Sequence, residues 1–208
     1  MRTILIALTV ASAPAFAQVS GNAQVYCAGD TPVLNVSASA SFADAGKPGA
    51  WFVAAHDPYD ASRIAYLTPA GWAVPDAPGT IIAYQDYPAG IPGNIAASAC
   101  VPAAFYTEGG GGYSAPNLSA CGQTTEPWAG YIVKVGYGVL TQEDEILVAT
   151  RRERLDFAKP TMIETGKWRA EYEDDDHMRK ALVIKHLREP GNIIDVLTVP
   201  YTSCYISG

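Results

Sequence analysis

The sequence has few histidines and lacks the short motifs that mark common enzyme classes. Only three of the 208 residues are histidine, and no HExxH pair is present, which argues against a zinc hydrolase. There is no GxSxG or SxxK serine motif, no GxxxxGK[ST] phosphate loop and no CxxCH haem-attachment site. A glycosidase carboxylate pair has no fixed local spacing, so that class stays open.

Basic residues are also scarce, with 14 Lys and Arg against 21 Asp and Glu and a formal net charge of −7. This balance argues against nucleic acid and anionic lipid as partners. Beyond the amino-terminal stretch, no segment is apolar for long enough to span a membrane. Residues 18–140 hold three basic and eight acidic residues, whereas residues 141–208 hold ten and thirteen. The chain therefore has a low-charge front and a charge-dense back.

The first seventeen residues, MRTILIALTVASAPAFA, have the features of a secretory signal peptide. Arg2 supplies the positive end, Ile4–Ala11 form an apolar stretch, and Ala15–Ala17 provide a small-x-small cleavage site. An uncleaved anchor is the alternative. We expect residues 1–17 to be removed and residues 18–208, about 190 residues, to form one exported domain in the periplasm or at the cell surface.

Four cysteines, Cys27, Cys100, Cys121 and Cys204, match this compartment. An even number in an oxidising environment predicts two disulfides, and three pairings are possible. We favour the pairs Cys100–Cys121, which closes a local loop, and Cys27–Cys204, which joins the ends of the mature chain. By reducing the chain entropy of the unfolded state, the short loop should stabilise the fold by about 3 kcal/mol and the long one by about 5 kcal/mol. No pair has CxxC spacing, which argues against thiol redox chemistry and zinc.

Short runs of alternating apolar and polar residues predict strands. In residues 33–42, VLNVSASASF, the apolar set points to one face and the polar set to the other. The apolar set is Leu34, Val36, Ala38, Ala40 and Phe42. Further strands are predicted at residues 50–56, 63–67, 71–74, 80–85, 131–137 and 192–201. Short strands separated by Pro/Gly turns predict a mainly β fold, an antiparallel sandwich or barrel.

The charge-dense back predicts one or two short helices in the carboxy-terminal third. Thr141 with Asp144 forms a capping-box pattern before an apolar run. Residues 171–192, EYEDDDHMRKALVIKHLREPGN, begin with acids and end with bases, which suits the helix dipole. We expect this part of the chain to form a salt-bridged, solvated cover over one sheet.

Two clusters raise the question of a metal. Asp174–Asp176 could bind calcium, but the stretch lacks the spacing and glycine of a calcium loop, so a helix start is favoured. His56, Asp57 and Asp60 could hold a metal, but an Asp-Pro turn explains the same residues. We therefore predict no metal and no other cofactor.

The segment FYTEGGGGYSAPNLSAC holds the main binding candidates. Four consecutive glycines cannot pack a core, so a mobile surface loop held at its base by the Cys100–Cys121 disulfide is one interpretation. The other is a binding loop with tyrosines at its edges and a tryptophan beside its base. Aromatic residues are also common in β cores, which remains an alternative for them. The predicted binding residues are Tyr106, Gly109, Gly110, Gly111, Gly112, Tyr113 and Trp128.

Three stretches, WFVAAHDP, AYLTPAGWAV and YIVKVGYG, resemble exported proteobacterial immunoglobulin-like β-sandwich modules of surface and pilus-associated proteins. The resemblance covers Ala50–Gly138. It implies an immunoglobulin-like fold with a binding or structural role, and it brings no catalytic residues.

Our first functional hypothesis is a non-enzymatic surface or periplasmic module that acts in adhesion or in a pilus-like assembly. Its partners would be other envelope or extracellular proteins, with glycan as a further possibility, and self-association is compatible with this role. The alternatives are a secreted carbohydrate-active hydrolase with a carboxylate pair and a periplasmic ligand-binding protein. A pocket lined by two acids would favour the enzyme, and an exposed aromatic face or open sheet edge the module.

Overall fold

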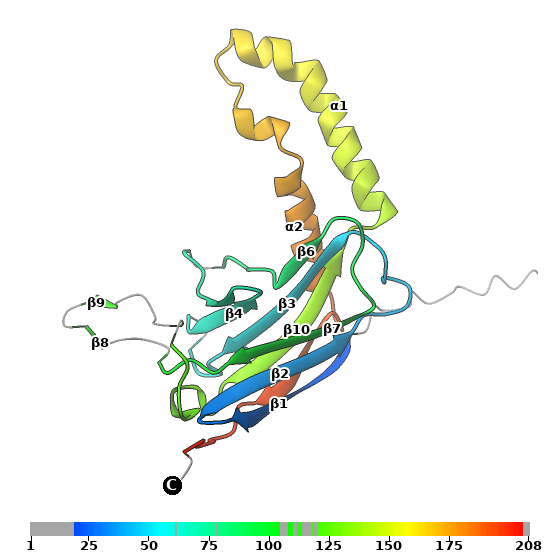
Figure 1. The fold of residues 1–208 in the computed structure, drawn as a ribbon. Helices are drawn as coiled ribbons and strands as arrows, with labels where there is room; N and C mark the ends of the chain where they lie inside the picture. Colours follow the sequence, from blue (N-terminus) through cyan, green and yellow to red (C-terminus); the bar gives the residue numbers. More distant parts are fainter. Residues whose placement is uncertain are drawn as a thin grey trace, which may run out of the picture.

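The computed structural model describes residues 19–205 except 61, 78, 105–107, 110–111, 114–117 and 119. The described chain is mostly β, with a three-stranded and a six-stranded antiparallel sheet, and its two α-helices lie in the carboxy-terminal part (Figure 1). This confirms the predicted fold class and is compatible with a β-sandwich. The signal-peptide prediction, residues 1–17, lies outside the described residues.

The three-stranded sheet has the order β1-β2-β7. Its strands are β1 (Ser20–Ala28), β2 (Thr31–Ser39) and β7 (Asn94–Cys100). Leu34, Val36 and Ala38 of β2 are buried, as the alternation predicted. Phe42 was expected to continue this buried row, and that expectation is wrong. The strand ends at Ser39, the chain turns, and Phe42 is 100% exposed.

The six-stranded sheet has the order β11-β10-β3-β4-β5, with β6 paired to β3. Its strands are β3 (Gly49–His56), β4 (Ile64–Thr68), β5 (Gly71–Ala73), β6 (Gln85–Tyr87), β10 (Ile132–Val139) and β11 (Ile193–Thr198). The strand predicted at residues 80–85 is wrong, because pairing with β3 begins only at Gln85. The predicted strand at residues 50–56 is confirmed as β3.

The strand β3 is buried on both faces and separates two hydrophobic clusters. Trp51 and Val53 face the three-stranded sheet, where they join the main core with Val135 and others. Ala50 and Phe52 face the other way and pack in a second cluster under a helix. The alternation of side chains along a strand explains how one strand serves both layers.

Two α-helices follow β10. They are α1 (Gln142–Glu164) and α2 (Asp176–Leu187), with the 3₁₀ turn η2 (Ala170–Glu173) between them. Thr141 and Asp144 form the predicted capping box at the start of α1. None of the described helices combines the length and apolar character needed to span a bilayer.

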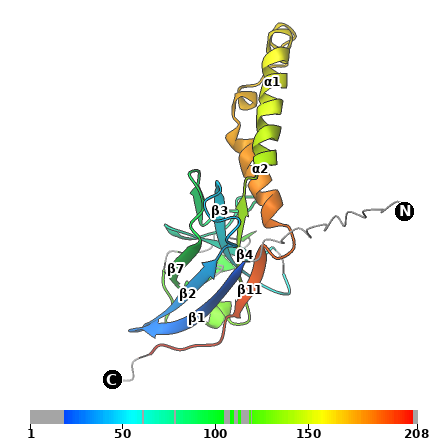
Figure 2. The ribbon, with the colours of Figure 1, turned by 90° about the vertical axis from the view of Figure 1, so that its right-hand side faces the viewer.

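The two helices form an arm, residues 142–187, that projects from one end of the β-structure (Figures 1 and 2). The sheet is covered mainly by α2, through Leu182, Val183 and Leu187, and α1 adds only Val148 to the same cluster. The expectation of short helices that all cover a sheet is therefore wrong for α1. This helix has 23 residues and buries only Val148, so little apolar contact holds it against the body.

Charged contacts join α1 to the returning chain. Asp175 pairs with both Arg151 and Arg152 of α1, at 3.5 and 3.0 Å. Lys159 pairs with Glu173 at 2.5 Å. The helical arm is thus held by ion pairs along most of its length, as the charge pattern of the back suggested.

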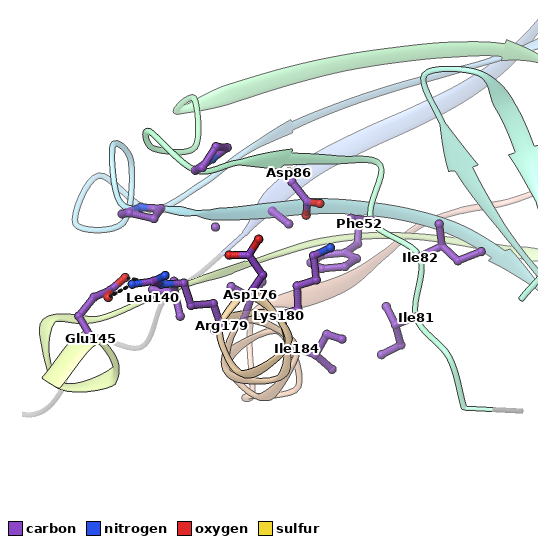
Figure 3. A pocket seen from close by; sticks show the side chains of 16 residues that line it. Phe52, Ile81, Ile82, Asp86, Leu140, Glu145, Asp176, Arg179, Lys180 and Ile184 are labelled. Carbon is purple, nitrogen blue, oxygen red and sulfur yellow. Dashed lines mark hydrogen bonds and ion pairs between the residues drawn. The ribbon is translucent and has the colours of Figure 1, made fainter. Parts of the chain in front are cut away.

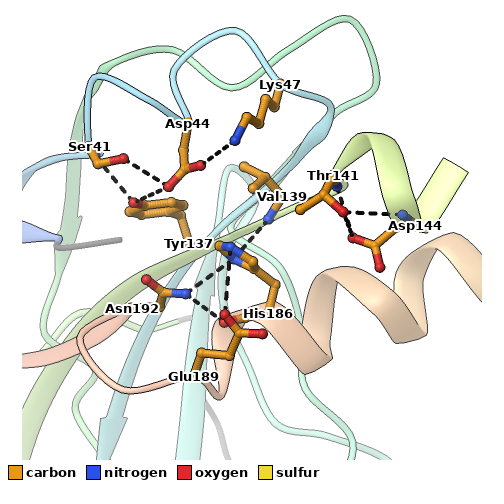
Figure 4. Close-up of polar contacts among 10 residues, drawn as sticks. All are labelled: Ser41, Asp44, Lys47, Tyr137, Val139, Thr141, Asp144, His186, Glu189 and Asn192. Atoms are coloured by element: carbon orange, nitrogen blue, oxygen red, sulfur yellow. Dashed lines mark hydrogen bonds and ion pairs between the residues drawn. The ribbon is translucent and has the colours of Figure 1, made fainter. Parts of the chain in front are cut away.

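Polar contacts fix the far end of β10 (Figure 4). The Tyr137 hydroxyl donates to Asp44 Oδ2 at 2.9 Å, and Lys47 Nζ lies 2.7 Å from the other oxygen of that carboxylate. The Val139 amide donates to Nδ1 of His186 at 3.4 Å. The first network ties a loop to β10, and the second ties α2 to it.

Both predicted disulfides are present. Cys27 joins Cys204 and Cys100 joins Cys121, with a Cα–Cα distance of 5.5 Å in each. The first links the start of the described chain to its end. The second closes the segment that contains the short strands β8 (Glu108–Gly109) and β9 (Gly112–Tyr113).

Candidate functional site

A groove of about 690 Å³ lies where the helical arm meets the sheet (Figure 3). One wall is α2, and the other is the segment that leads into β6. The floor comes from β3 and from Leu140, which directly follows β10. Its apolar lining consists of Ala50, Phe52, Ile81, Ile82, Ala83, Leu140, Val183 and Ile184.

The local structure explains why this groove stays open. The strand β6 pairs only with Gly49–Trp51, one end of β3. The preceding residues run beside the sheet without strand pairing, and the Tyr84 amide donates to the Trp51 carbonyl at 2.7 Å. Ile81 is thereby placed against the second cluster, across from Ile184 of α2. Ile81 and Ile82 of the TIIAYQ segment therefore line the groove and do not belong to a strand.

Charged residues surround the apolar floor. Arg179 and Glu145 form an ion pair at 2.9 Å across the base of the arm. The hydrogen bonds that Arg179 donates to the Glu145 carboxylate raise the pKa of Arg179, which keeps the guanidinium charged. Among the described residues, no ion pair joins the three remaining charges, Asp86, Asp176 and Lys180, to an opposite charge.

The two aspartates come from opposite walls. Figure 3 shows Asp86, on β6, and Asp176, at the start of α2, both directed toward the groove. Both residues are exposed, so water reaches the carboxylates. The arrangement can bury an apolar group between Phe52 and Ile184 while a cation lies near the aspartates. A groove of this kind can bind a ligand, since the apolar contact would provide affinity and the charged groups selectivity.

The predicted binding residue Trp128 does not reach this groove. It lies in the 3₁₀ turn η1 (Glu126–Trp128) and is 1% exposed. Its ring packs 5.1 Å from that of Trp72 and 5.5 Å from that of Tyr131. Trp128 therefore packs in the aromatic core, and its side chain offers almost no surface to a partner.

The glycine-rich segment is described only in part. Gly109 and Gly112 pair as the β8–β9 hairpin, and Tyr113 lies on β9. Tyr106, Gly110 and Gly111 lie outside the described residues. None of the described residues of this segment lines the groove. The binding role of the segment stays a prediction.

The acidic stretch begins a helix, as predicted. Asp175 is the N-cap of α2, and Asp174 accepts a hydrogen bond from the Asp176 amide at 2.8 Å. What the sequence did not indicate is that the three aspartates have different surroundings. Asp175 pairs with arginines of α1, whereas Asp176 reaches the groove.

The second metal candidate is a turn. Asp57 accepts a hydrogen bond from the Tyr59 amide, and Asp60 accepts one from the Ser62 amide. Both carboxylates also lie within ion-pair distance of Arg63. Within the described part of the chain, no group of three or more His, Cys, Asp or Glu residues is placed to hold a metal ion.

Sequence reasoning missed the groove because its residues come from separated positions, from Pro48 to Ile184. The one local signal was the adjacent pair Ile81 and Ile82, next to a turn and close to Asp86. Comparisons with protein-family models, curated proteins and solved structures find no match for this chain.

Proposed function

We propose that this protein is an exported, non-enzymatic binding module of the periplasm or cell surface, a component of an envelope assembly or of an adhesion system. The observation that carries this proposal is the groove between α2 and β6, which combines an apolar floor with two unpaired, exposed carboxylates. Two disulfides and an overall negative charge support a role outside the reducing cytoplasm with a protein partner.

The occupant that fits is a segment of a partner protein with an apolar side chain next to Lys or Arg. Burying one Leu or Phe between Phe52 and Ile184 would contribute about 1.5–3 kcal/mol. Exposed ion pairs with Asp86 and Asp176 would add about 0–1 kcal/mol each and would speed association. The apolar contact therefore supplies most of the affinity, and the charges select the partner.

A carbohydrate-active hydrolase is the second candidate, because two carboxylates face one groove. Such enzymes need one carboxyl group that stays protonated at working pH, and burial is the usual means. Asp86 and Asp176 are exposed and lie on the rim. This favours binding over acid catalysis.

The test compares groove variants with a matched surface variant during co-purification from the native envelope. We expect Ile184→Ser and the double change Asp86→Asn with Asp176→Asn each to remove the co-purifying partner. Asp76→Asn, at an exposed aspartate outside the groove, should retain it. If all variants retain the partner, the groove is not the binding site. Polysaccharide hydrolysis by the wild type that is lost in the double variant would establish the enzyme instead.

The glycine-rich segment is a separate proposed contact. Deleting Gly109–Gly112 and changing Tyr106 and Tyr113 to Ala tests it in the same assay. Loss of the partner in this variant, with the groove variants unaffected, would move the site to the glycine-rich segment.

A further inference from the structure

The side of α1 that faces away from α2 combines apolar and acidic residues. A helix turns by about 100° per residue, so positions 146, 153, 157, 160 and 164 lie along one side. Phe157 is 90% exposed and Ile146 is 60% exposed. We call this surface the outer stripe, and it consists of exposed residues only: Glu143, Ile146, Ala149, Glu153, Phe157, Pro160 and Glu164.

The opposite side of α1 makes the contacts that hold the arm. Val148 is buried there, Arg151 pairs with Asp175, and Lys159 pairs with Glu173. In Figure 1, no other labelled element lies beyond α1 on the side away from α2. The outer stripe therefore contributes nothing to the hairpin that the described residues reveal, and its large apolar side chains remain in water.

Pro160 lies on the stripe and shapes it. Proline inside a helix removes one backbone hydrogen bond and bends the helix away from the ring. Figure 1 shows the far end of α1 curving toward the side of η2 and α2. The outer stripe is thus the convex side of a bent helix, which is accessible to a partner along its whole length of about 35 Å.

The charges of the stripe decide what can cover it. Glu143, Glu153 and Glu164 are the charged residues of the stripe. Exposed Arg154 borders it, about 20° around the helix from Glu143, so the surface keeps a net negative charge. A second copy in the antiparallel register centred on Glu153 would bring Glu153 against Glu153 and place Glu143 within one residue of Glu164, and like charges repel. An anionic membrane surface is disfavoured for the same reason. A surface with apolar and basic residues is complementary.

We propose that the outer stripe of α1 docks a basic amphipathic helix of another protein, with Phe157 as the central anchor. A helix with apolar residues at i, i+3, i+4 and i+7 and Lys or Arg beside them would cover Ile146 and Phe157 while it pairs with the glutamates. This surface is separate from the groove. A chain with both contacts would connect two partners.

The experiment uses a synthetic helix of about 18 residues with Leu along one side and Lys elsewhere. A peptide with Glu in place of Lys and a scrambled Leu/Lys peptide are its controls. We expect the full-length protein to bind the first peptide and neither control. Phe157→Ala should weaken binding about 30-fold, the loss typical of an aromatic hot spot. Phe42→Ala, which removes an equally exposed phenylalanine elsewhere, should leave binding unchanged.

The glutamates supply a second readout. Changing Glu143, Glu153 and Glu164 to Gln should weaken binding and reduce its dependence on salt, because screened ion pairs are lost. Both sets of substitutions are at exposed positions, so folding should persist and circular dichroism can check it. The proposal is overturned if Phe42→Ala acts like Phe157→Ala, if the acidic peptide binds equally, or if Phe157→Ala abolishes self-association instead. Loss of peptide binding in the groove variants alone would place the peptide in the groove, which also overturns it.

Discussion

At the scale of single residues, Asp44 is the buried charge on which a loop depends. It is 5% exposed and accepts hydrogen bonds from Ser41, Lys47 and Tyr137. Burial alone would raise the pKa of Asp44, but the hydrogen bonds outweigh burial and hold the pKa below its ordinary value of 3.8. We expect Asp44→Asn to lower the free energy of unfolding by about 1–3 kcal/mol at pH 7.

The pH dependence of this effect has a defined direction. A carboxyl group whose pKa is lower in the folded state stabilises the fold above its unfolded pKa, and this contribution is lost as the pH falls through the folded value. The difference between wild type and Asp44→Asn should therefore narrow below about pH 4. Urea unfolding at pH 7 and pH 3 measures it, with the exposed Asp76→Asn as the control. A difference that grows on acidification would contradict this account.

Gly138 is a second residue with a specific structural role. A Cβ at this position would overlap the carbonyl oxygen of Val183, which belongs to the backbone of α2. Gly138→Ala should displace α2 from the sheet and cost about 1–3 kcal/mol, as overpacking does. At Gly93, a Cβ would meet its nearest neighbour at 3.7 Å, an ordinary contact. Equal melting temperatures for Gly138→Ala and Gly93→Ala would show that the helix adapts without cost.

At the scale of elements, the ion pairs of Asp175 should control local opening of the helical arm. Its carboxylate joins two arginines of α1, and α1 buries only Val148. We expect Asp175→Asn to lower the opening free energy of α1 by about 1 kcal/mol. Hydrogen exchange should then accelerate in residues 145–165 and stay constant in β3 and β10. The exposed Asp156→Asn is the control, and faster exchange throughout the sheets would refute a local role.

The elements that sequence patterns predicted are those in which burial alternates. Val133, Val135 and Tyr137 of β10 and Tyr131 just before it are all buried, as expected from period-two spacing. The strands β1 and β7 were missed because SGNAQVYCA and NIAASAC hold small and polar residues that give little contrast between faces. For these strands, pairing with β2 decides the structure more than local preference does.

The length of α1 escaped prediction for a related reason. A helix packed on a core shows an apolar stripe with a 3.6-residue period, but α1 meets the chain mainly through ion pairs and exposes Phe157. α1 also continues past Pro160, a residue type that usually ends a helix. The groove could not be inferred locally, because Phe52, Asp86 and Ile184 approach one another only after the sheet and α2 have packed.

At the scale of the whole molecule, we expect the two disulfides to contribute unequally to the free energy of unfolding. Cys27–Cys204 spans 177 residues, whereas Cys100–Cys121 spans 21. Because loop entropy grows with the logarithm of length, the longer bridge should contribute about 5 kcal/mol and the shorter about 3 kcal/mol. The longer bridge also fastens the end of β1 to the chain beyond β11, so it joins the edges of the two sheets.

Replacing Cys27 and Cys204 with serine should therefore lower the free energy of global unfolding more than replacing Cys100 and Cys121. Neither bridge contacts the helical arm, so local hydrogen exchange in α1 should be the same in both variants and in the wild type. Chemical denaturation gives the global free energy, and native-state exchange gives the local one. A larger loss from the Cys100 and Cys121 pair would contradict the entropic ranking. An arm held by its own ion pairs does not respond to a constraint between the sheet edges. Faster exchange in α1 after loss of the longer bridge would therefore show that the arm and the β-structure unfold as one unit.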